Sequence, residues 1–343
     1  MVVSKRPQYL CFLFILIICA CSNVTLDAPQ GNWLIFTETD GLVCDNVQGV
    51  DIDGKGDIWF ATLEGVSVLA SDGTWTSYRA DDGLGVNRTV DVLVDKNDRV
   101  WVATTGGGLC RFNGVSWEAF RTENSNLPDN YIIELAEDQL GNIWVLSSYG
   151  LSVVYPDDTI MYVGSPFSLA PGYKPTFHSL AIDAEGHIWI GTLGAALAEY
   201  DPENDRWSWI GRITEHVAIP LKNSSGVVIW DIAVDQENHL WIATNTIVEV
   251  EGEHWRIHQL DYTPLSVFVT PDGYKWFSTA GGTLLLLSPD NTRWGRYDPP
   301  WKKWYDPINS GWTGSVVNDM AWDSEGRLWF ATENGAVQFI LKQ

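Results

Sequence analysis

Positive charge and cysteine are both scarce in this sequence. Its 343 residues hold 21 Lys and Arg against 44 Asp and Glu, which gives a net charge of −23. A surface this acidic repels phosphate backbones, so nucleic acid is excluded as a partner. Only five cysteines are present, three of them within the first 21 residues, and the fold therefore does not depend on a disulfide framework. Outside residues 10–20, no apolar run approaches the length of a membrane span.

Residues 1–20 combine a short basic stretch at positions 5 and 6 with an apolar run over residues 10–20. This is the composition of a secretory signal peptide. The run ends in Ile18-Cys19-Ala20 before Cys21, which resembles the bacterial lipobox, so we expect Cys21 to be lipidated. The alternatives are ordinary secretory cleavage or an uncleaved anchor. We expect a bacterial, extracytoplasmic protein, periplasmic or cell-surface, held to the envelope by a lipid on Cys21 and a tether of residues 21–30.

Tryptophan, in contrast, is abundant, with nineteen residues, and it recurs in a fixed context. Seven of them, here called anchor tryptophans, lie 42, 43, 45, 52, 35 and 53 residues apart: Trp59, Trp101, Trp144, Trp189, Trp241, Trp276 and Trp329. Counted from the anchor, position −6 is Asp in six units, −3 is Gly in five, +3 is Thr or Ser in all seven, and +6 is Gly in five. This register indicates seven copies of one structural repeat.

Each unit has the chemistry of four β-strands. Asp at the first and Gly at the fourth position of a tight turn suit a type I turn, and apolar stretches such as Val47–Ile52 and Ile58–Phe60 flank it. The Gly at +6 opens a second turn before a third strand, and another tryptophan, as at Trp75 and Trp117, begins a fourth. Four antiparallel strands about every 45 residues are typical of a propeller blade.

We therefore expect an all-β fold, a seven-bladed β-propeller with four-stranded blades over residues 31–343. The last unit stops after its third strand, Ala336–Leu341, whereas Trp33–Phe36 repeats the fourth-strand pattern without the three strands that should precede it. If residues 31–37 supply the outer strand of the last blade, the ring closes and each end of the chain holds the other in place.

The repeat itself resembles the two-component regulator propeller repeat. Close matches are Asp183-Ala-Glu-Gly-His-Ile-Trp-Ile-Gly-Thr192 and Asp323-Ser-Glu-Gly-Arg-Leu-Trp-Phe-Ala-Thr332. The resemblance implies a ligand-binding propeller, because in that family such repeats commonly form the extracytoplasmic sensor of a histidine kinase, often for glycans. We expect no kinase or membrane span to follow the propeller here. The chain is also similar, more weakly, to streptogramin lyases, which have a His and acidic metal site at the ring centre.

Three inter-blade connections are long, residues 163–176, 210–228 and 298–316, and we expect all three on one face of the ring. The last of them is rich in aromatic residues, and flat rings on a proline-stiffened loop offer stacking surface for sugars or apolar ligands. We therefore expect ligand contacts from Trp301, Trp304, Tyr305 and Trp312, together with Trp230 and His178. The equally favoured alternative is that the tryptophans of the loop plug the channel mouth or fasten the loop to the blades.

Four carboxylates fall at position −10, near the start of the strands that line the channel: Asp91, Glu134, Asp231 and Asp319. They form a predicted acidic ring that suits sugar hydroxyls or a Ca or Mg ion, the one cofactor we consider. We favour the alternative that each bonds the repeat Thr or a neighbouring backbone amide. Apart from this ring, no His-x-His, HExxH or serine-nucleophile motif indicates a metal or catalytic centre.

We expect a surface-tethered, monomeric propeller that binds a glycan, or an envelope or extracellular protein, through the face with the long connections. We favour a non-enzymatic role. The alternative is a lyase or hydrolase resembling streptogramin lyase, which would use His178 or His216 with Asp231 or Asp319, since these two histidines are the pair expected to meet at the binding face. A third alternative is a scaffold for assembly of envelope proteins.

Overall fold

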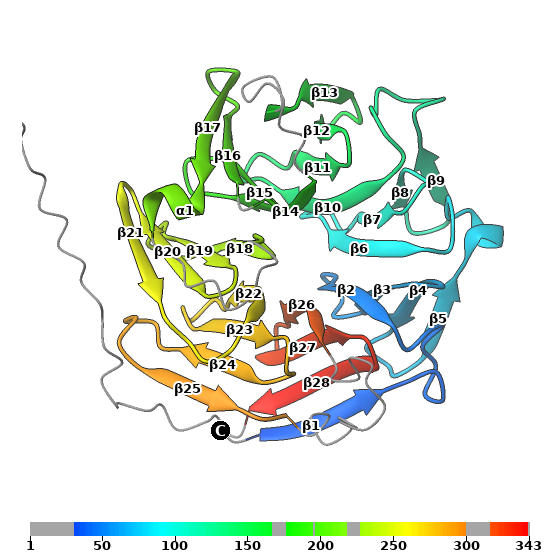
Figure 1. Cartoon of the computed structure of the whole chain (residues 1–343). Coiled ribbons are helices and arrows are strands. Elements are labelled where there is room, and N and C mark those ends of the chain that lie inside the picture. The colour runs from blue at the N-terminus through cyan, green and yellow to red at the C-terminus, as the bar shows by residue number, and fades with distance from the viewer. Residues whose placement is uncertain (1–30, 167–175, 195, 218–226, 300–315, 342–343) are drawn as a thin grey trace, which may run out of the picture.

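The computed structural model describes residues 31–166, 176–194, 196–217, 227–299 and 316–341. Within these residues, seven antiparallel sheets of four strands each are arranged as blades around a central axis (Figure 1). The predicted all-β, seven-bladed propeller is therefore confirmed. In the same part of the chain, no helix is long and apolar enough to cross a membrane.

The blades are numbered in chain order, with their strands given from the centre outward. Blade 1 contains β2 (Val47–Ile52), β3 (Ile58–Thr62), β4 (Gly65–Leu69) and β5 (Trp75–Tyr78), and blade 2 contains β6 (Thr89–Val94), β7 (Val100–Thr104), β8 (Leu109–Phe112) and β9 (Trp117–Phe120). Blade 3 contains β10 (Ile132–Glu137), β11 (Ile143–Ser147), β12 (Gly150–Val154) and β13 (Ile160–Gly164), and blade 4 contains β14 (Phe177–Ile182), β15 (Ile188–Thr192), β16 (Ala196–Asp201) and β17 (Arg206–Arg212). Blade 5 contains β18 (Asp231–Val234), β19 (Leu240–Ala243), β20 (Ile247–Glu251) and β21 (His254–His258), and blade 6 contains β22 (Pro264–Val269), β23 (Lys275–Thr279), β24 (Leu284–Leu287) and β25 (Trp294–Tyr297). Blade 7 contains β26 (Val317–Trp322), β27 (Arg327–Thr332), β28 (Gly335–Leu341) and β1 (Gly31–Phe36). A 3₁₀ turn, η1 (Ala80–Asp82), follows β5, and a single helical turn, α1 (Ile213–His216), follows β17.

The two ends of the described chain meet in blade 7. β1 pairs antiparallel with β28 from Gly31 opposite Leu341 to Phe36 opposite Ala336, and the blue and red arrows lie side by side in Figure 1. Trp33 stacks on Phe339 with ring centroids 4.2 Å apart, and its Nε1 donates to the hydroxyl of Tyr297 in blade 6 at 2.7 Å. The predicted closure by residues 31–37 is confirmed, with the strand ending at Phe36.

The turn between the first two strands of each blade explains the Asp and Gly of the repeat. In all seven turns the backbone N–H at −3 donates to the carbonyl at −6, for example Gly186 to Asp183 at 3.0 Å. Position −3 has positive φ, such as 86° at Gly186 and 65° at Asn238, and this is why only Gly, Asn and Asp occur there. The carboxylate of Asp183 accepts the Nε1 proton of Trp189 at 2.8 Å, which joins the turn to the second strand.

The Thr and Gly of the repeat shape the next turn, between the second and third strands. The hydroxyl at +3 donates to a backbone carbonyl of that turn in every blade, as Thr62 does to Gly65 at 2.8 Å. Gly65 has a φ of 136°, and a Cβ there would lie 2.3 Å from the carbonyl oxygen of Tyr78 on the outer strand. A larger residue would therefore push the outer strand away.

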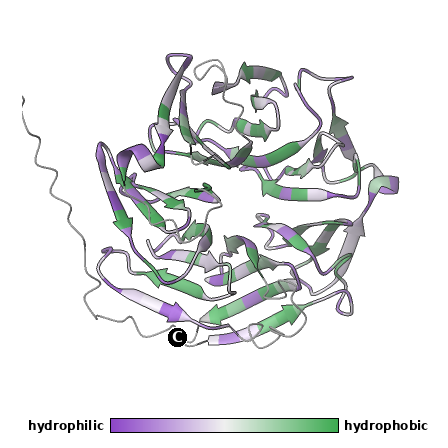
Figure 2. Cartoon of the chain, viewed as in Figure 1, coloured by the Kyte–Doolittle hydropathy of each residue, from purple (hydrophilic) through white to green (hydrophobic). Residues whose placement is uncertain are grey.

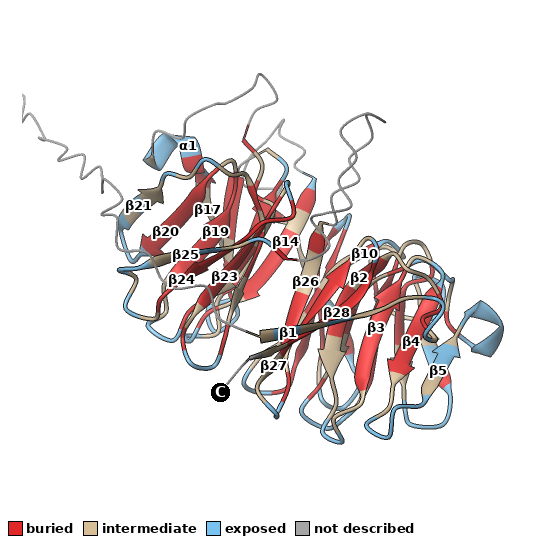
Figure 3. Cartoon of the chain, turned by 90° about the horizontal axis from the view of Figure 1, so that it is seen from below, coloured by how far each residue is buried: buried red, intermediate tan, exposed pale blue. Residues whose placement is uncertain are grey.

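The hydrophobic core is divided among the boundaries between blades. One cluster, for example, joins Trp59 and Val68 of blade 1 to Val92 and Val102 of blade 2. Figure 2 shows hydrophobic residues along the strands, and Figure 3 shows that the buried residues lie in the strands while the exposed ones gather at turns and outer strands. Six anchor tryptophans are buried and Trp189 is partly buried, so each anchor contributes a large apolar surface to the packing of neighbouring sheets.

The innermost strand of a blade leaves regular pairing near its start. In six blades the register shifts between positions −12 and −10, so the residue at −11 is an unpaired β-bulge residue. In blade 5 the equivalent residue, Trp230, directly precedes β18, and its backbone N–H donates to Ala243 at 2.9 Å. The bulge breaks the alternation of the strand, so side chains at both −11 and −10 reach the central cavity in five of the blades.

Candidate ligand-binding site

The inner strands begin around a cavity of about 1130 Å³ at the centre of the ring. Turns between second and third strands contribute to its wall, as Thr105 and Ser148 do. Each inter-blade connection leads to the start of an inner strand, so the connections and the cavity share one side of the propeller. This side is called the cavity face below.

The residues at position −11 surround the cavity, and all seven of them line it. This bulge ring consists of Gln48, Val90, Ile133, His178, Trp230, Leu265 and Asn318. No two of its members are the same residue type, whereas the turn and anchor positions of the repeat hardly vary. The blades therefore accept seven different side chains at one equivalent position, although three of them, Val90, Ile133 and Trp230, also pack against the core between blades.

His178 and Trp230, two members of the bulge ring from neighbouring blades, are in direct contact. Their rings meet edge to face, with centroids 5.4 Å apart and an interplanar angle of 89°. Nδ1 of His178 lies 2.9 Å from the backbone carbonyl of Trp230, and because a carbonyl only accepts, Nδ1 carries the proton. Burial lowers the pKa of His178, so the ring is neutral at pH 7 and Nε2 has the lone pair. The cavity wall thus combines a hydrogen-bond acceptor with an indole ring.

The carboxylates at position −10 connect the blades. Asp231 accepts from its neighbour Ile232 N and from Val267 N of blade 6, both at 2.8 Å, and Asp319 bonds Val50 N of blade 1 at 2.9 Å in the same way. The other two do likewise: Asp91 with Leu135 at 2.8 Å and Glu134 with Leu180 at 2.6 Å. Blade 1 has Gly at −10, and there Asp51 takes the role by accepting from Val94 N of blade 2 at 2.7 Å. The favoured backbone-amide interpretation therefore describes these residues, with the amides belonging to the next blade.

These five carboxylates are difficult to ionise. Burial raises the pKa of Asp51 and of Asp231 to about 7 and that of Asp319 to about 6, and repulsion from Asp319 adds to the effect in the first two. Burial and neighbouring carboxylates raise the pKa of Asp91 and of Glu134 well above the ordinary range. The charge that remains at neutral pH gives the base of the cavity a negative potential, which disfavours anionic ligands.

Several predicted site residues are not brought together at the cavity. His216 stacks on Trp255 with centroids 4.4 Å apart, donates from Nε2 to the carbonyl of Ile210, and does not line the cavity, so its expected pairing with His178 is wrong. The reason is local, because α1 begins directly after β17 and keeps His216 over blade 5. Cys21 and the aromatic residues of the last long connection lie outside the described residues: Trp301, Trp304, Tyr305 and Trp312.

A metal centre like that of streptogramin lyases does not fit the residues that the structure describes. Among them, no group of three or more His, Cys, Asp or Glu side chains could hold a metal ion. The physical reason is that the carboxylates at −10 direct their oxygens at backbone N–H groups.

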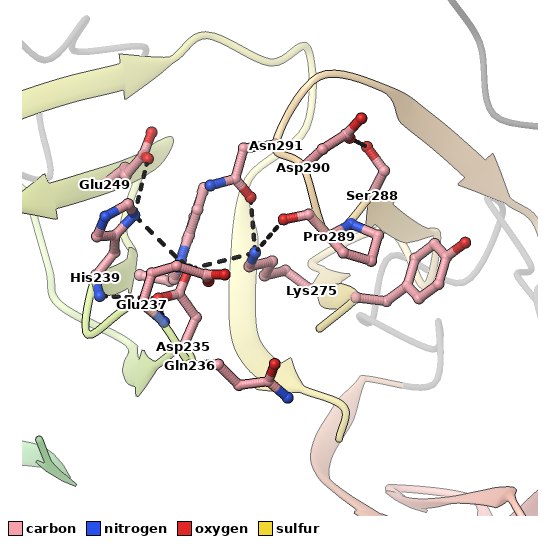
Figure 4. A network of polar contacts seen from close by, with 12 residues as sticks. Asp235, Gln236, Glu237, His239, Glu249, Lys275, Ser288, Pro289, Asp290 and Asn291 are labelled. Atoms are coloured by element: carbon pink, nitrogen blue, oxygen red, sulfur yellow. Dashed lines mark hydrogen bonds and ion pairs between the residues drawn. The ribbon is translucent and has the colours of Figure 1, made fainter. Parts of the chain in front are cut away.

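A second polar cluster lies at the opposite end of blades 5 and 6 (Figure 4). Lys275 replaces the apolar residue that the other blades have at −1, is fully buried, and has its Nζ 3.3 Å from Asp235 and 2.7 Å from Asn291. Nearby, the buried Glu249 accepts from Nε2 of His258 at 2.8 Å. None of these residues lines the cavity, and the contact between Lys275 and Asp235 joins blades 5 and 6.

Most residues of the bulge ring were not predicted from the sequence. The prediction of a ring of site residues rested on position −10, because carboxylates recur there. Only His178 and Trp230 were named. The signal that could have found the ring is its variation: among near-invariant repeat positions, −11 changes in every unit. Recurrence marks residues that serve the blade, whereas variation at an inward-facing position marks residues free to serve a ligand.

The comparisons with known proteins agree with this architecture. Three segments, residues 126–149, 223–246 and 311–334, match the family model of the two component regulator propeller. The chain carries two component regulator propeller repeats. No curated protein sequence matches it.

Solved structures with a similar fold belong to proteins of different activity. The extracellular domain of a putative hybrid two component system from B. thetaiotaomicron is 19% identical, with a TM-score of 0.71, over 92% of this chain and 41% of that one. Virginiamycin B lyase from Staphylococcus aureus is 15% identical, with a TM-score of 0.66, over 92% and 99% of the two chains. YCF48 bound to D1 peptide is 13% identical, with a TM-score of 0.69, over 94% and 100%. At these identities the likeness shows the shared fold alone.

Proposed function

We propose that this chain is an extracytoplasmic binding or sensing propeller that takes its ligand in the cavity, at the bulge ring. The observation that carries the proposal is that seven different side chains occupy one equivalent position around a cavity of about 1130 Å³. The turn position, which serves the fold, is Asp in six of the seven units, whereas no residue type recurs in the bulge ring. A ring of unlike side chains presents an asymmetric surface to an asymmetric ligand.

The chemistry of the cavity favours a neutral or cationic ligand with both apolar and hydroxyl groups. Trp230 and Leu265 offer apolar surface, His178 offers an acceptor, and Thr105 and Ser148 contribute hydroxyls. The partly ionised carboxylates beneath them disfavour anions. A glycan fits this description, as does a segment of an envelope or extracellular protein.

The cellular setting completes the proposal. The extracellular domain of the two component system from B. thetaiotaomicron shows that such a propeller can work outside the cytoplasm, and the lipobox-like sequence before Cys21 supports tethering by a lipid. Labelling with a radioactive fatty acid tests the tether. We expect label in the full chain and none in Cys21→Ser, and label retained by that variant would contradict it.

Binding of a neutral glycan array by the wild type and by Trp230→Ala tests the site. The matched control is Val115→Ala, an exposed residue of the turn between β8 and β9 on the opposite face. We expect Trp230→Ala to weaken binding by at least roughly tenfold and the control to leave it unchanged. Unchanged binding in Trp230→Ala would refute the cavity as the site.

The lyase or hydrolase alternative has less support. His178 is the one histidine among the described residues that lines the cavity, and the acids that would assist it, Asp231 and Asp319, accept hydrogen bonds from two backbone amides each. A binding role needs no further titratable group.

A further inference from the structure

Blade 3 presents three exposed tyrosines at the cavity face. Tyr131 directly precedes β10, and Tyr149 lies in the turn between β11 and β12. Tyr162 is the central residue of β13, and its hydroxyl lies close to Gly150 at the end of that turn. Their exposed fractions are 52%, 63% and 39%. These three residues, called the tyrosine row below, extend outward from the cavity, because Tyr131 lines it and β13 is the outermost strand of the blade.

The row is held in place by contacts of its own blade and of blade 2. The carbonyl of Tyr131 accepts from Ser148 N at 3.0 Å, which joins the start of the inner strand to the turn that bears Tyr149. The rings of Tyr149 and Tyr162 lie 6.3 Å apart at 45°, and the ring of Tyr131 lies over Gly106 of blade 2. From β10 to β13 the row spans three strand spacings, roughly 14 Å, so it suits a chain of linked rings better than a single ring.

The propeller does not require aromatic residues at these places. In the other blades the position of Tyr149 is Glu, Gly, Thr or Asn, and that of Tyr131 is Asn, Arg, Thr or Val. The fold thus forms equally well with small or polar residues there. Three large apolar side chains left in contact with water on one blade need an explanation other than packing.

We propose that the tyrosine row is a binding subsite for a neutral oligosaccharide whose end enters the cavity. Tyrosine rings stack on the apolar faces of sugar rings, and their hydroxyls remain available to sugar hydroxyls. The net charge of −23 disfavours an acidic saccharide. A protein partner is less suited, because a specific protein interface covers about 800 Å² on each side, far more than one row of three rings.

This inference rests on the proposed function, because it assigns one ligand to the cavity and to the row. Isothermal titration of the full chain with maltohexaose, cellohexaose, xylohexaose and laminarihexaose, and with the matching monosaccharides, tests it. Tyr149→Ala and Tyr162→Ala remove rings of the row, Tyr149→Phe retains the ring, and Leu140→Ala removes an exposed side chain at the opposite end of the same blade.

We expect at least one hexasaccharide to bind, with affinity lowered roughly tenfold in each alanine variant and nearly kept in Tyr149→Phe and Leu140→Ala. The monosaccharides should bind the wild type and the variants alike, since a single ring does not extend over the row.

The outcomes separate the two proposals. If Trp230→Ala abolishes hexasaccharide binding while the tyrosine variants bind normally, the row is not a subsite but the cavity remains the site. If no saccharide binds and a peptide does, the oligosaccharide assignment is wrong and the binding function stands. If the chain binds neither, both proposals fail.

Discussion

At the scale of single residues, six turn aspartates account for much of the regularity of the repeat. Each accepts the Nε1 proton of its anchor tryptophan and the backbone N–H groups two and four residues further on, as Asp183 does from Trp189, Glu185 and His187. Asp183 is 7% exposed, so its carboxylate is largely shielded from water and makes these three hydrogen bonds in place of hydration. Such hydrogen bonds to a charged acceptor are among the stronger ones in proteins.

Asp183→Ala should therefore lower the free energy of unfolding by about 3 kcal/mol, because it removes three hydrogen bonds to one buried carboxylate. Urea denaturation measures the change. Asp157→Ala, in an exposed turn of blade 3, is the control and should change stability by less than about 0.5 kcal/mol. Equal stability of the two variants would show that the turn aspartates do not stabilise the blades.

At the scale of secondary-structure elements, β1 is the strand that closes the ring of blades. It is the outer strand of blade 7 although it comes first in the chain, and Trp33 packs on Phe339 while bonding Tyr297 of blade 6. It thereby joins the two ends of the described chain in one blade and closes the row of blades into a ring.

Trp33→Ala should cost about 3 kcal/mol of stability, at the low end for a tryptophan because Trp33 is only partly buried. Hydrogen exchange should then be accelerated first in β28 and β1. Leu34→Ala changes a neighbouring side chain that is 46% exposed and should leave both quantities near the wild-type values. Exchange that accelerates evenly around the ring would argue against a local closing role for β1.

The blades could be predicted from the sequence because their determinants are local. The Asp-to-Gly turn, the Thr that caps the next turn and the anchor tryptophan all act within about a dozen residues. The site could be predicted only in part, because a β-bulge cannot be recognised in a sequence such as Val90-Asp91. The partner of Asp91, Leu135 N, lies in the next blade, 44 residues away.

At the scale of the whole molecule, the interblade carboxylates make stability depend on pH. The pKa of Asp231 is raised from 3.8 in an unfolded chain to about 7, so the folded chain binds more protons than the unfolded one between these values. The stabilising contribution is complete below about pH 4 and is lost as the pH rises through about 7.

Unfolding by urea should therefore require less denaturant at about pH 8 than at about pH 5. In Asp231→Asn the decline should be shallower by up to about 1.4 kcal/mol per pH unit, because one titrating group is absent. A wild-type stability that rises over this range would contradict the assignment of raised pKa values to these carboxylates.

The central claim is that two adjacent positions have separate roles, −11 in ligand binding and −10 in joining blades. Trp230→Ala and Asp231→Asn test it in one measurement, thermal unfolding with and without the glycan that the wild type binds best. We expect Trp230→Ala to melt somewhat below the wild type, because Trp230 packs on the core between blades 5 and 6, and to lose the shift caused by the glycan. Asp231→Asn should also melt lower, because it loses one of the two side-chain oxygens that accept backbone N–H groups, and should keep the shift. The reverse pattern would contradict the account.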